Sequence, residues 1–286
     1  MPLFAAERCV MKKLAFIGVG NMAKATLSGI FCSSDESIKW SDIILYNRHP
    51  EKIESYREYG AHIADSLKEA VECADYVFLC VKPQNFPDVL PYLSTCNSVS
   101  DKVFVTMAAG ISMQTVSDAA LGAAVVRVMP NTPMLIGKGV IAACRNDKTT
   151  DHDFDFVCNI FKRSGSVMVI DESEMNRIIS VTGSSPAYVF LMIKAMYDGA
   201  VSQGLVTDGG ISEKEIIDSI CDTIIGSASL MKAGNKTPDE QIEMVASKGG
   251  TTERAVAELK DREFCEAIVS AMQKCTDRAN ELGKNE

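Results

Sequence analysis

The stretch Lys13–Ala23 constrains the fold of this chain more than any other. An apolar run ends there in the pattern Gly-x-Gly-x-x-Ala, and apolar residues then continue at helical spacing to Ile30. This pattern is typical of a buried strand, a tight turn and a helix that together bind a dinucleotide, although some glycine-rich turns bind nothing. The pyrophosphate then lies at the helix N-terminus. We predict cofactor contacts from Gly18, Gly20, Asn21, Met22 and Ala23.

Composition indicates a globular protein. The 286 residues suffice for two ordinary domains, and 47% of them are hydrophobic against 23% charged. No apolar run approaches the length of a membrane span, and we expect a cytoplasmic protein with no membrane partner. The net charge is −9, and acidic residues exceed basic ones both before and after residue 172. This balance argues against nucleic acid as a partner.

Cysteines and histidines do not indicate a metal site. The ten cysteines include no Cys-x-x-Cys pair, and none of the three histidines lies beyond His152. We therefore expect free thiols in a reducing compartment and no metal. Residues 1–10 are too short and too polar for a signal peptide. We expect a disordered extension there, or translation that begins at Met11.

Strand-like runs alternate with helical segments as far as residue 171. Their β-branched and aromatic residues follow one another without alternation, which is typical of parallel strands buried on both faces. We predict a Rossmann-type, doubly wound parallel α/β sheet of about eight strands over residues 11–171. After the first strand, we place strands at 42–46, 75–81, 102–107, 124–129, 139–143 and 166–170, and a helix near 151–163.

The second strand ends in Asn47-Arg48 and not in an acidic residue. An acidic side chain at this point accepts a hydrogen bond from the ribose 2′-hydroxyl of NAD. Arg48 can instead pair with a 2′-phosphate, and Asn47 can donate to it. We therefore expect NADPH as the cofactor, with NADH as a second choice. The alternative is a solvated turn before the helix that starts near Pro50.

Three later loops follow the carboxyl ends of predicted strands, where open α/β sheets bind their ligands. We expect the loops that contain Val81–Pro83 and Ala108–Gly110 to border the nicotinamide. The segment Pro130–Pro133 is equally well interpreted as a stiff loop without a function. The residues concerned are Val81, Lys82, Pro83, Ala108, Ala109, Gly110 and Asn131.

From Glu174 onward, apolar residues recur at helical spacing and no strand-like run appears. We predict an all-helical second domain over residues 172–286. Its segment Pro186–Leu205 is apolar on almost every side. A domain of this size cannot easily bury such a helix alone, so we expect a second subunit to cover it.

Two stretches of the helical domain combine small side chains with hydroxyls, Thr182–Tyr188 and Ser247–Glu253. Each can bind an anion or a polar ligand, and each is equally well interpreted as ordinary helix capping. The domain has no histidine to act as the base in alcohol oxidation. Reduction of a protonated C=N group needs only positioning and a hydrogen bond to nitrogen, which Thr251 or Thr252 can provide.

Taken together, these motifs resemble the pyrroline-5-carboxylate reductase family. The resemblance covers about residues 11–283, with the matching blocks in the expected order and at the expected separations. The blocks are Gly18–Ala23, Val81–Gln84, Ala108–Ile111, Arg127–Pro133, Gly183–Tyr188 and Gly249–Thr252.

The resemblance implies NAD(P)H-dependent reduction of 1-pyrroline-5-carboxylate to L-proline, the last step of proline synthesis. It also implies a homodimer with interlocked helical domains, and an active site between the cofactor domain of one subunit and the helical domain of the other. Association of such dimers into a ring stays open. By this likeness, Thr252 is the catalytic residue and hydrogen-bonds the ring nitrogen. The substrate carboxylate is then bound by the amides of Gly249, Gly250 and Thr251, with Ser247 beside them.

Two positions depart from the family pattern. Lys248 replaces the usual proline before the Gly-Gly pair, which makes the loop less stiff and adds a cation that favours a carboxylate substrate. Ser185 replaces a glycine, and if that position needs a positive φ, the serine costs about 1 kcal/mol.

Two other functions stay open. One is a 3-hydroxy-acid dehydrogenase that uses Lys194 as its base, although a lysine that extends to the helix edge is the simpler interpretation. The other is a non-catalytic NADP-binding protein on the same scaffold. The intact Gly249–Thr252 motif argues against that alternative.

Overall fold

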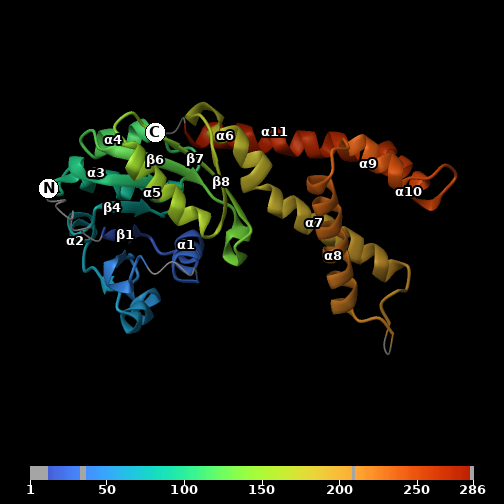
Figure 1. Ribbon diagram of the computed structural model, residues 1–286, viewed down its shortest axis with the longest axis horizontal. Coiled ribbons are helices and arrows are strands. Elements are labelled where there is room, and N and C mark those ends of the chain that lie inside the picture. Colours follow the sequence, from blue (N-terminus) through green and yellow to red (C-terminus); the bar gives the residue numbers. More distant parts are fainter. Residues whose placement is uncertain (1–11, 33–36, 208–209, 284–286) are drawn as a thin grey trace, which may run out of the picture. The chain divides into compact units, whose positions relative to one another are not determined.

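The computed structural model describes residues 12–32, 37–207 and 210–283. The predicted extension 1–10 and the alternative start at Met11 lie outside the described residues. The chain forms two compact units, of which the second spans Ser185–Lys274 and the first holds the residues before and after it (Figure 1). This division differs from the predicted boundary at residue 171, because the segment that follows the sheet and the end of the last helix both pack on the sheet.

A single sheet organises the first unit. Its strands are β1 (Leu14–Ile17), β2 (Ile43–Tyr46), β3 (His62–Ile63), β4 (Tyr76–Leu79), β5 (Val103–Thr106), β6 (Ala124–Met129), β7 (Gly139–Arg145) and β8 (Gly165–Val169). Their order is β3-β2-β1-β4-β5-β6-β7-β8, and all neighbours are parallel except β6 and β7. The chain reverses its direction of winding at β1, as in dinucleotide-binding sheets. The predicted doubly wound fold is therefore confirmed.

Two details of the sheet differ from the sequence prediction. The two-residue strand β3 is too short to give an apolar pattern, and it is defined by its pairing with β2. The strand β7 runs antiparallel to β6. The connection between them, Pro130–Lys138, is too short for the helical crossover that parallel neighbours need.

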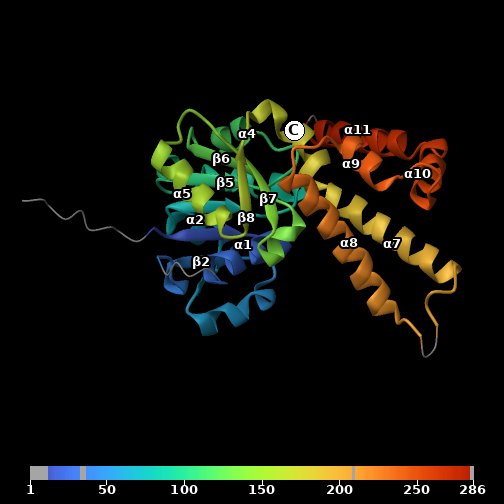
Figure 2. The ribbon, with the colours of Figure 1, turned by 45° about the vertical axis from the view of Figure 1, so that its right-hand side comes forward.

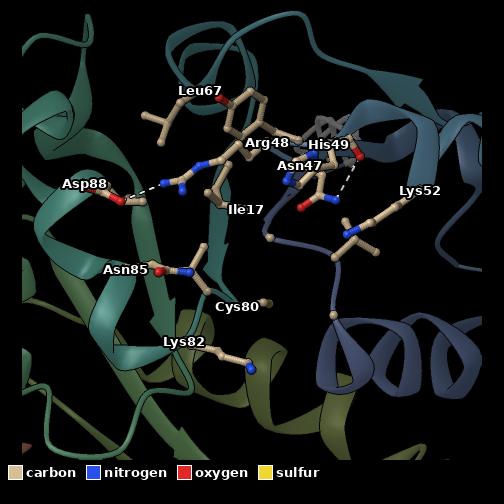
Figure 3. A pocket seen from close by; sticks show the side chains of 16 residues that line it. Ile17, Asn47, Arg48, His49, Lys52, Leu67, Cys80, Lys82, Asn85 and Asp88 are labelled. Carbon is tan, nitrogen blue, oxygen red and sulfur yellow. Dashed lines mark hydrogen bonds and ion pairs between the residues drawn. The ribbon is translucent and has the colours of Figure 1, made fainter.

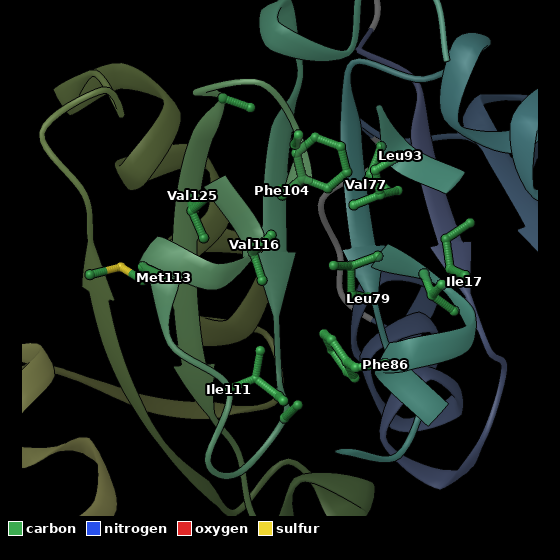
Figure 4. Packing of buried hydrophobic residues seen from close by; sticks show 14 of the residues in the cluster. Ile17, Val77, Leu79, Phe86, Leu93, Phe104, Ile111, Met113, Val116 and Val125 are labelled. Atoms are coloured by element: carbon green, nitrogen blue, oxygen red, sulfur yellow. The ribbon is translucent and has the colours of Figure 1, made fainter. Parts of the chain in front are cut away.

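Helices cover both faces of the sheet. One face packs against α1 (Asn21–Cys32) and α5 (Asp151–Lys162), which confirms the helix predicted near 151–163. The other packs against α2 (Leu67–Glu72), α3 (Leu90–Leu93), α4 (Met113–Ala119) and α6 (Met175–Ile178). Figure 4 shows part of this second layer, where Phe86 and Leu93 pack on Val77 and Leu79 of β4. Burial on both faces explains why the strands are apolar without alternation.

A buried arginine fastens the segment after the sheet to the sheet itself. Arg127 of β6 is only 4% exposed. Its Nη1 lies 3.2 Å from Glu172 Oε1, and its Nη2 donates to Asn176 Oδ1 at 2.9 Å. Asn176 donates in turn to Asn280, near the end of α11 (Phe264–Leu282), at 3.0 Å. A buried charge must be paired and hydrogen-bonded, so these contacts hold both segments against β6.

The second unit is mainly helical in its described residues, as predicted, with one isolated β-bridge between Val206 and Ile211. It comprises α7 (Ser185–Ser202), α8 (Glu213–Ala233), α9 (Pro238–Val245), α10 (Thr251–Asp261) and most of α11. Figure 2 shows α7 and α8 side by side from a second angle, and the two helices pack on each other.

Contact with α8 leaves most of the apolar helix α7 exposed. None of its residues is buried, and Phe190 and Leu191 are 62% and 69% exposed. The helical run Glu172–Ser202 that contains it is, by length and composition alone, able to cross a membrane. Apolar helices that pack in a protein interior meet the same criteria.

We expect the buried hydroxyl of Tyr76 to contribute to stability. It donates to Asp153 Oδ1 at 2.6 Å, and Tyr76 is fully buried. Burial would raise the pKa of Asp153, but the hydrogen bonds from Tyr76 and Thr150 hold that pKa below its usual value. A lowered carboxylate pKa stabilises the fold above the unfolded-state pKa, and this stability is lost as the pH falls through the folded-state pKa.

Tyr76→Phe should therefore lower the free energy of unfolding by about 1.5 kcal/mol near neutral pH, the value of a hydrogen bond to a charged group. Urea unfolding at about pH 7 and about pH 3 measures the effect. The difference between the two proteins should shrink at the lower pH, where Asp153 takes up a proton. Tyr92→Phe, at a side chain 60% exposed, is the control and should change little. An equal loss at both pH values would contradict the role of the Asp153 charge.

Candidate functional site

A cleft of about 410 Å³ lies in the first unit at the carboxyl end of β1 (Figure 3). Its walls come from the turn after β1, the loop after β2, and the loop and short helix after β4. The residues predicted for the cofactor that line this cleft are Gly18, Gly20, Asn47, Arg48, Val81 and Lys82.

The turn after β1 is held in place by both neighbouring strands. The Gly18 amide donates to Tyr46 O at 2.8 Å, and the Cys80 amide donates to Ile17 O at 2.9 Å. Gly18 has a φ of 85°, and a Cβ at this position would lie 2.6 Å from Val81 Cγ1. Only glycine combines this backbone with this close approach.

The position of Gly20 fits a dinucleotide pyrophosphate. A Cβ on Gly20 would meet no heavy atom within 4 Å, so the backbone here faces open space. Helix α1 begins directly after it at Asn21 and carries no acidic residue in its first turn. The first-turn amides have no intrahelical acceptor and form the positive end of the helix dipole. Ala23 is fully buried, as close packing of the helix on the sheet requires.

Most of the charged side chains in the cleft lining are cationic. Arg48, Lys52 and Lys82 line it, and among the lining residues Asp88 is the one carboxylate. Arg48 Nη2 lies 2.7 Å from Asp88 Oδ2. The side-chain amide of Asn47 donates to the backbone oxygen of His49 at 3.0 Å. Arg48 thus lines the cleft, as predicted for a cofactor residue, and its guanidinium has an anionic partner there.

Cys80, the one cysteine of the cleft lining, is not an activated thiol. Burial raises the pKa of the Cys80 thiol far above its usual value, so this cysteine stays protonated. Throughout the described residues, no group of three or more His, Cys, Asp or Glu side chains could hold a metal ion. The described cysteines are all free, as predicted.

The loops predicted to border the nicotinamide make more contacts within the chain than the sequence suggested. Pro83 begins a short 3-10 helix, Pro83–Asp88, directly after Lys82. Gly110 has a φ of 81°, and a Cβ there would lie 2.8 Å from Leu282 Cβ. Its conformation therefore serves the packing of the C-terminal segment. Ala108 is buried, and Ala109 is partly buried.

Asn131 connects two parts of the first unit. Its Nδ2 donates to Thr182 O at 2.9 Å, and its Oδ1 accepts from the Val140 amide at 2.9 Å. The side chain is 7% exposed. Both ends of the amide are thus occupied by the backbone, and Asn131 shapes the loop after β6. A cofactor contact for Asn131 stays a prediction, as it does for Pro83, Ala108, Ala109 and Gly110.

The candidate substrate loop lies in the second unit, before α10. Gly249 has a φ of 76°, and its amide donates to Glu253 Oε2 at 2.6 Å. The Gly250 amide donates to Ser247 O at 2.9 Å. Both glycine amides therefore already have acceptors within the chain, which the sequence did not indicate.

Helix α10 begins at Thr251, so the amides of Thr251 and Thr252 lie in its first turn. Gly250 is the N-cap residue and provides no side-chain cap. The first-turn amides are thus open to an external acceptor. Thr252 is partly buried and Thr251 is exposed.

The stretch Thr182–Tyr188, considered from the sequence as a ligand site or as helix capping, is helical along most of its length. Residues Ile179–Gly183 form a π-helical turn that leads into α7, and the Ser184 amide donates to Ile179 O at 2.7 Å. Small residues at this point allow a wide helical turn as well as a loop, and periodicity does not distinguish the two. Ser185 is the first residue of α7, so the family's glycine position needs no positive φ here.

Lys194, the base considered for a hydroxy-acid dehydrogenase, is exposed. Its side chain is 68% accessible and forms an ion pair with Asp198 one helical turn away. This environment is that of a lysine at a helix edge, as the simpler interpretation of the sequence has it.

Two sequence profiles of known families match the chain. The profile described as "Pyrroline-5-carboxylate reductase dimerisation" matches residues 172–282. The profile described as "NADP oxidoreductase coenzyme F420-dependent" matches residues 13–110. The first match begins at the boundary predicted from the sequence, 13 residues before the second compact unit starts at Ser185.

Individual relatives match almost the whole chain. Pyrroline-5-carboxylate reductase of Escherichia coli is 35% identical over 96% of this chain and 99% of its own length. The enzyme of Corynebacterium melassecola is 34% identical over 96% of this chain and 100% of its own. Among solved structures, the Plasmodium falciparum pyrroline carboxylate reductase with NADP bound has a TM-score of 0.83 at 26% identity. The similarity covers 95% of this chain and 98% of that one.

Alanine at Gly18 should affect stability, whereas alanine at Gly20 should affect NADPH binding. Gly18→Ala should destabilise the protein, because the new methyl group clashes with Val81 and the φ of 85° is unfavourable. Gly20→Ala should leave the melting temperature unchanged, because its methyl group meets nothing, but should weaken NADPH binding at least about tenfold by filling the pyrophosphate position. Thermal melts and NADPH titrations of both variants separate the effects. Unchanged NADPH affinity in Gly20→Ala would exclude this turn from the cofactor site.

Proposed function

This chain belongs to the pyrroline-5-carboxylate reductase family, and we propose that it reduces 1-pyrroline-5-carboxylate to L-proline with NAD(P)H, the last step of proline biosynthesis. The cleft at the carboxyl end of β1 carries the proposal. Its glycine turn, open helix N-terminus and cationic lining fit a phosphate-containing dinucleotide. Members of the family match this chain over nearly its full length.

The residues of the first unit position the cofactor, and bound NADPH supplies the hydride. Gly20 and the first turn of α1 receive the pyrophosphate, and Arg48 pairs with the 2′-phosphate. Lys52 and Lys82 add positive potential to the same cleft. NADH is the second choice for the same site.

The residues of the second unit position the substrate. We assign the ring-nitrogen hydrogen bond to Thr252, whose hydroxyl accepts from the protonated imine N–H. The carboxylate is assigned to the amides of Gly249, Gly250 and Thr251, with Ser247 beside them. The Gly249 amide donates to Glu253 Oε2, and the Gly250 amide donates to Ser247 O. A substrate carboxylate bound by these amides would displace both acceptors. No charged base is needed, because the imine nitrogen already carries the proton.

The exposed apolar side chains of α7 support a homodimer through the helical domain. The matched dimerisation profile spans this helix. Large exposed apolar surfaces mark protein–protein contacts, and a second copy would bury them. A ring of dimers would require further contacts.

The cell compartment and other partners follow from composition. Free cysteines suit a reducing cytoplasm. The net charge of −9 disfavours nucleic acid. We assign the apolar run that contains α7 to the dimer and not to a membrane.

The direct test of the function is a NADPH oxidation assay with pyrroline-5-carboxylate. Purified protein should consume NADPH and form L-proline in equal amounts. Absence of turnover at every pH from about 6 to about 9 would contradict the proposal. Cofactor binding without turnover would support the non-catalytic alternative. Substrate panels that include the six-membered cyclic imine would define the preferred ring size.

Thr252→Val should lower kcat/KM by about 10- to 100-fold, which corresponds to the loss of one hydrogen bond to a charged group. Thr251→Val is the matched control, because Thr251 keeps its backbone amide and its hydroxyl has no assigned role. NADPH affinity should be unchanged in both variants. Equal kcat/KM for Thr252→Val and the wild type would remove this hydroxyl from the mechanism.

Leu191→Glu should disrupt the dimer, because it places a charge on the most exposed of the α7 leucine and phenylalanine side chains. Leu121→Asp is the control, since this leucine is 61% exposed but lies in the first unit. Sedimentation analysis should show a dimer for the wild type and the control, and a smaller species for Leu191→Glu. A dimer in all three proteins would place the interface elsewhere.

A further inference from the structure

The ion pair between Arg48 and Asp88 crosses the candidate cofactor cleft. Arg48 follows β2, and Asp88 ends the short 3-10 helix that follows β4, so the pair joins the loops on either side of β1. Figure 3 shows the guanidinium directed at the Asp88 carboxylate. Arg48 and Asp88 also line a second hollow of about 680 Å³ beside the cleft, so the pair forms part of the wall between the two spaces.

Asp88 is the one negatively charged side chain in the cleft lining. The other charged side chains of the lining are Arg48, Lys52 and Lys82, which all attract phosphate groups. Asp88 Oδ2 lies 2.7 Å from Arg48 Nη2 and so occupies one edge of the guanidinium. A phosphate bound by the same guanidinium would compete with this carboxylate and would also be repelled by it.

The competition distinguishes two cofactors that differ by one group. NADPH carries a 2′-phosphate on its adenosine ribose, whereas NADH carries a hydroxyl. The phosphate needs Arg48 as its counter-ion, and the hydroxyl does not. Binding of NADPH must therefore weaken the Arg48–Asp88 pair, whereas binding of NADH leaves it intact.

We infer that Asp88 is a specificity-determining residue that reduces the preference for NADPH over NADH by competing with the 2′-phosphate for Arg48. This inference rests on the proposed function, in which a nicotinamide dinucleotide binds in this cleft. The Arg48 and Asp88 side chains are 66% and 60% exposed. An exposed ion pair is weak, so the competition is worth a several-fold change in affinity and not several orders of magnitude.

The test compares dissociation constants of NADPH and NADH, measured by nucleotide fluorescence in the absence of substrate. Asp88→Asn removes the charge with little change in shape. It should tighten NADPH binding by about threefold to fivefold and leave NADH binding unchanged. Adenosine 2′,5′-bisphosphate and 5′-AMP, used as competitors, differ only in the 2′-phosphate. They should show the same selectivity, which places the effect at the adenosine end.

A double-mutant cycle isolates the pair. Arg48→Ala should weaken NADPH binding more than NADH binding. Adding Asp88→Asn to Arg48→Ala should then have no further effect on NADPH, because the carboxylate acts through the guanidinium. Glu54→Gln is the matched control. It breaks the exposed Arg57–Glu54 pair, also 2.7 Å long, outside the cleft lining, and it should leave the NADPH-to-NADH ratio unchanged.

The outcomes separate this inference from the proposed function. If the wild type binds NADPH but Asp88→Asn leaves the ratio unchanged, only the role of Asp88 is overturned. Weaker NADPH binding in Asp88→Asn would also overturn it, because Asp88 would then hold Arg48 in place for the phosphate. If the wild type binds neither nucleotide nor either competitor, the cofactor assignment of the cleft fails together with the inference.

Discussion

The left-handed backbone of Gly18 is the constraint on which the candidate site depends. Its φ of 85° turns the chain from a buried strand into α1 within a few residues, and Val81 packs where a Cβ would lie. Hydrogen bonds to Tyr46 and from Cys80 fasten this turn to the strands on both sides. The ends of β1, β2 and β4 therefore meet at the N-terminus of α1, where backbone amides face open space. A side chain at residue 18 would disturb all three.

Both candidate anion-binding elements contain a carboxylate of the chain itself. Asp88 pairs with Arg48 in the first unit, and Glu253 accepts from the Gly249 amide in the second. The groups assigned to phosphate or carboxylate ligands thus have an internal anion as partner. Such a partner satisfies the donor and makes ligand binding an exchange of anions. Exchange lowers the net affinity but keeps the site organised before the ligand arrives.

Sequence patterns predicted the sheet well and its connections less well. Runs such as Val77–Leu79 are buried on both faces, and this burial leaves a pattern that can be recognised along the chain. The strand β3 leaves none, because pairing alone defines two residues. The antiparallel direction of β7 depends on the length of the connection before it. Asn131 was predicted as a cofactor residue for its place in a motif, but its amide bonds Val140 and Thr182, which no local pattern could indicate.

By itself, the sequence determined the order of the longer strands, the glycine turn, the apolar helix α7 and the family. Each of these is encoded in residues close together in the chain or in their order along it. Only the tertiary structure decided which side chains are already occupied. The pairing of Arg48 with Asp88 joins residues 40 positions apart, and the Arg127 contacts join residues 45 and 49 apart. Such contacts form because the fold brings segments that are far apart in the chain to the same part of the sheet. Spacing along the chain does not specify them.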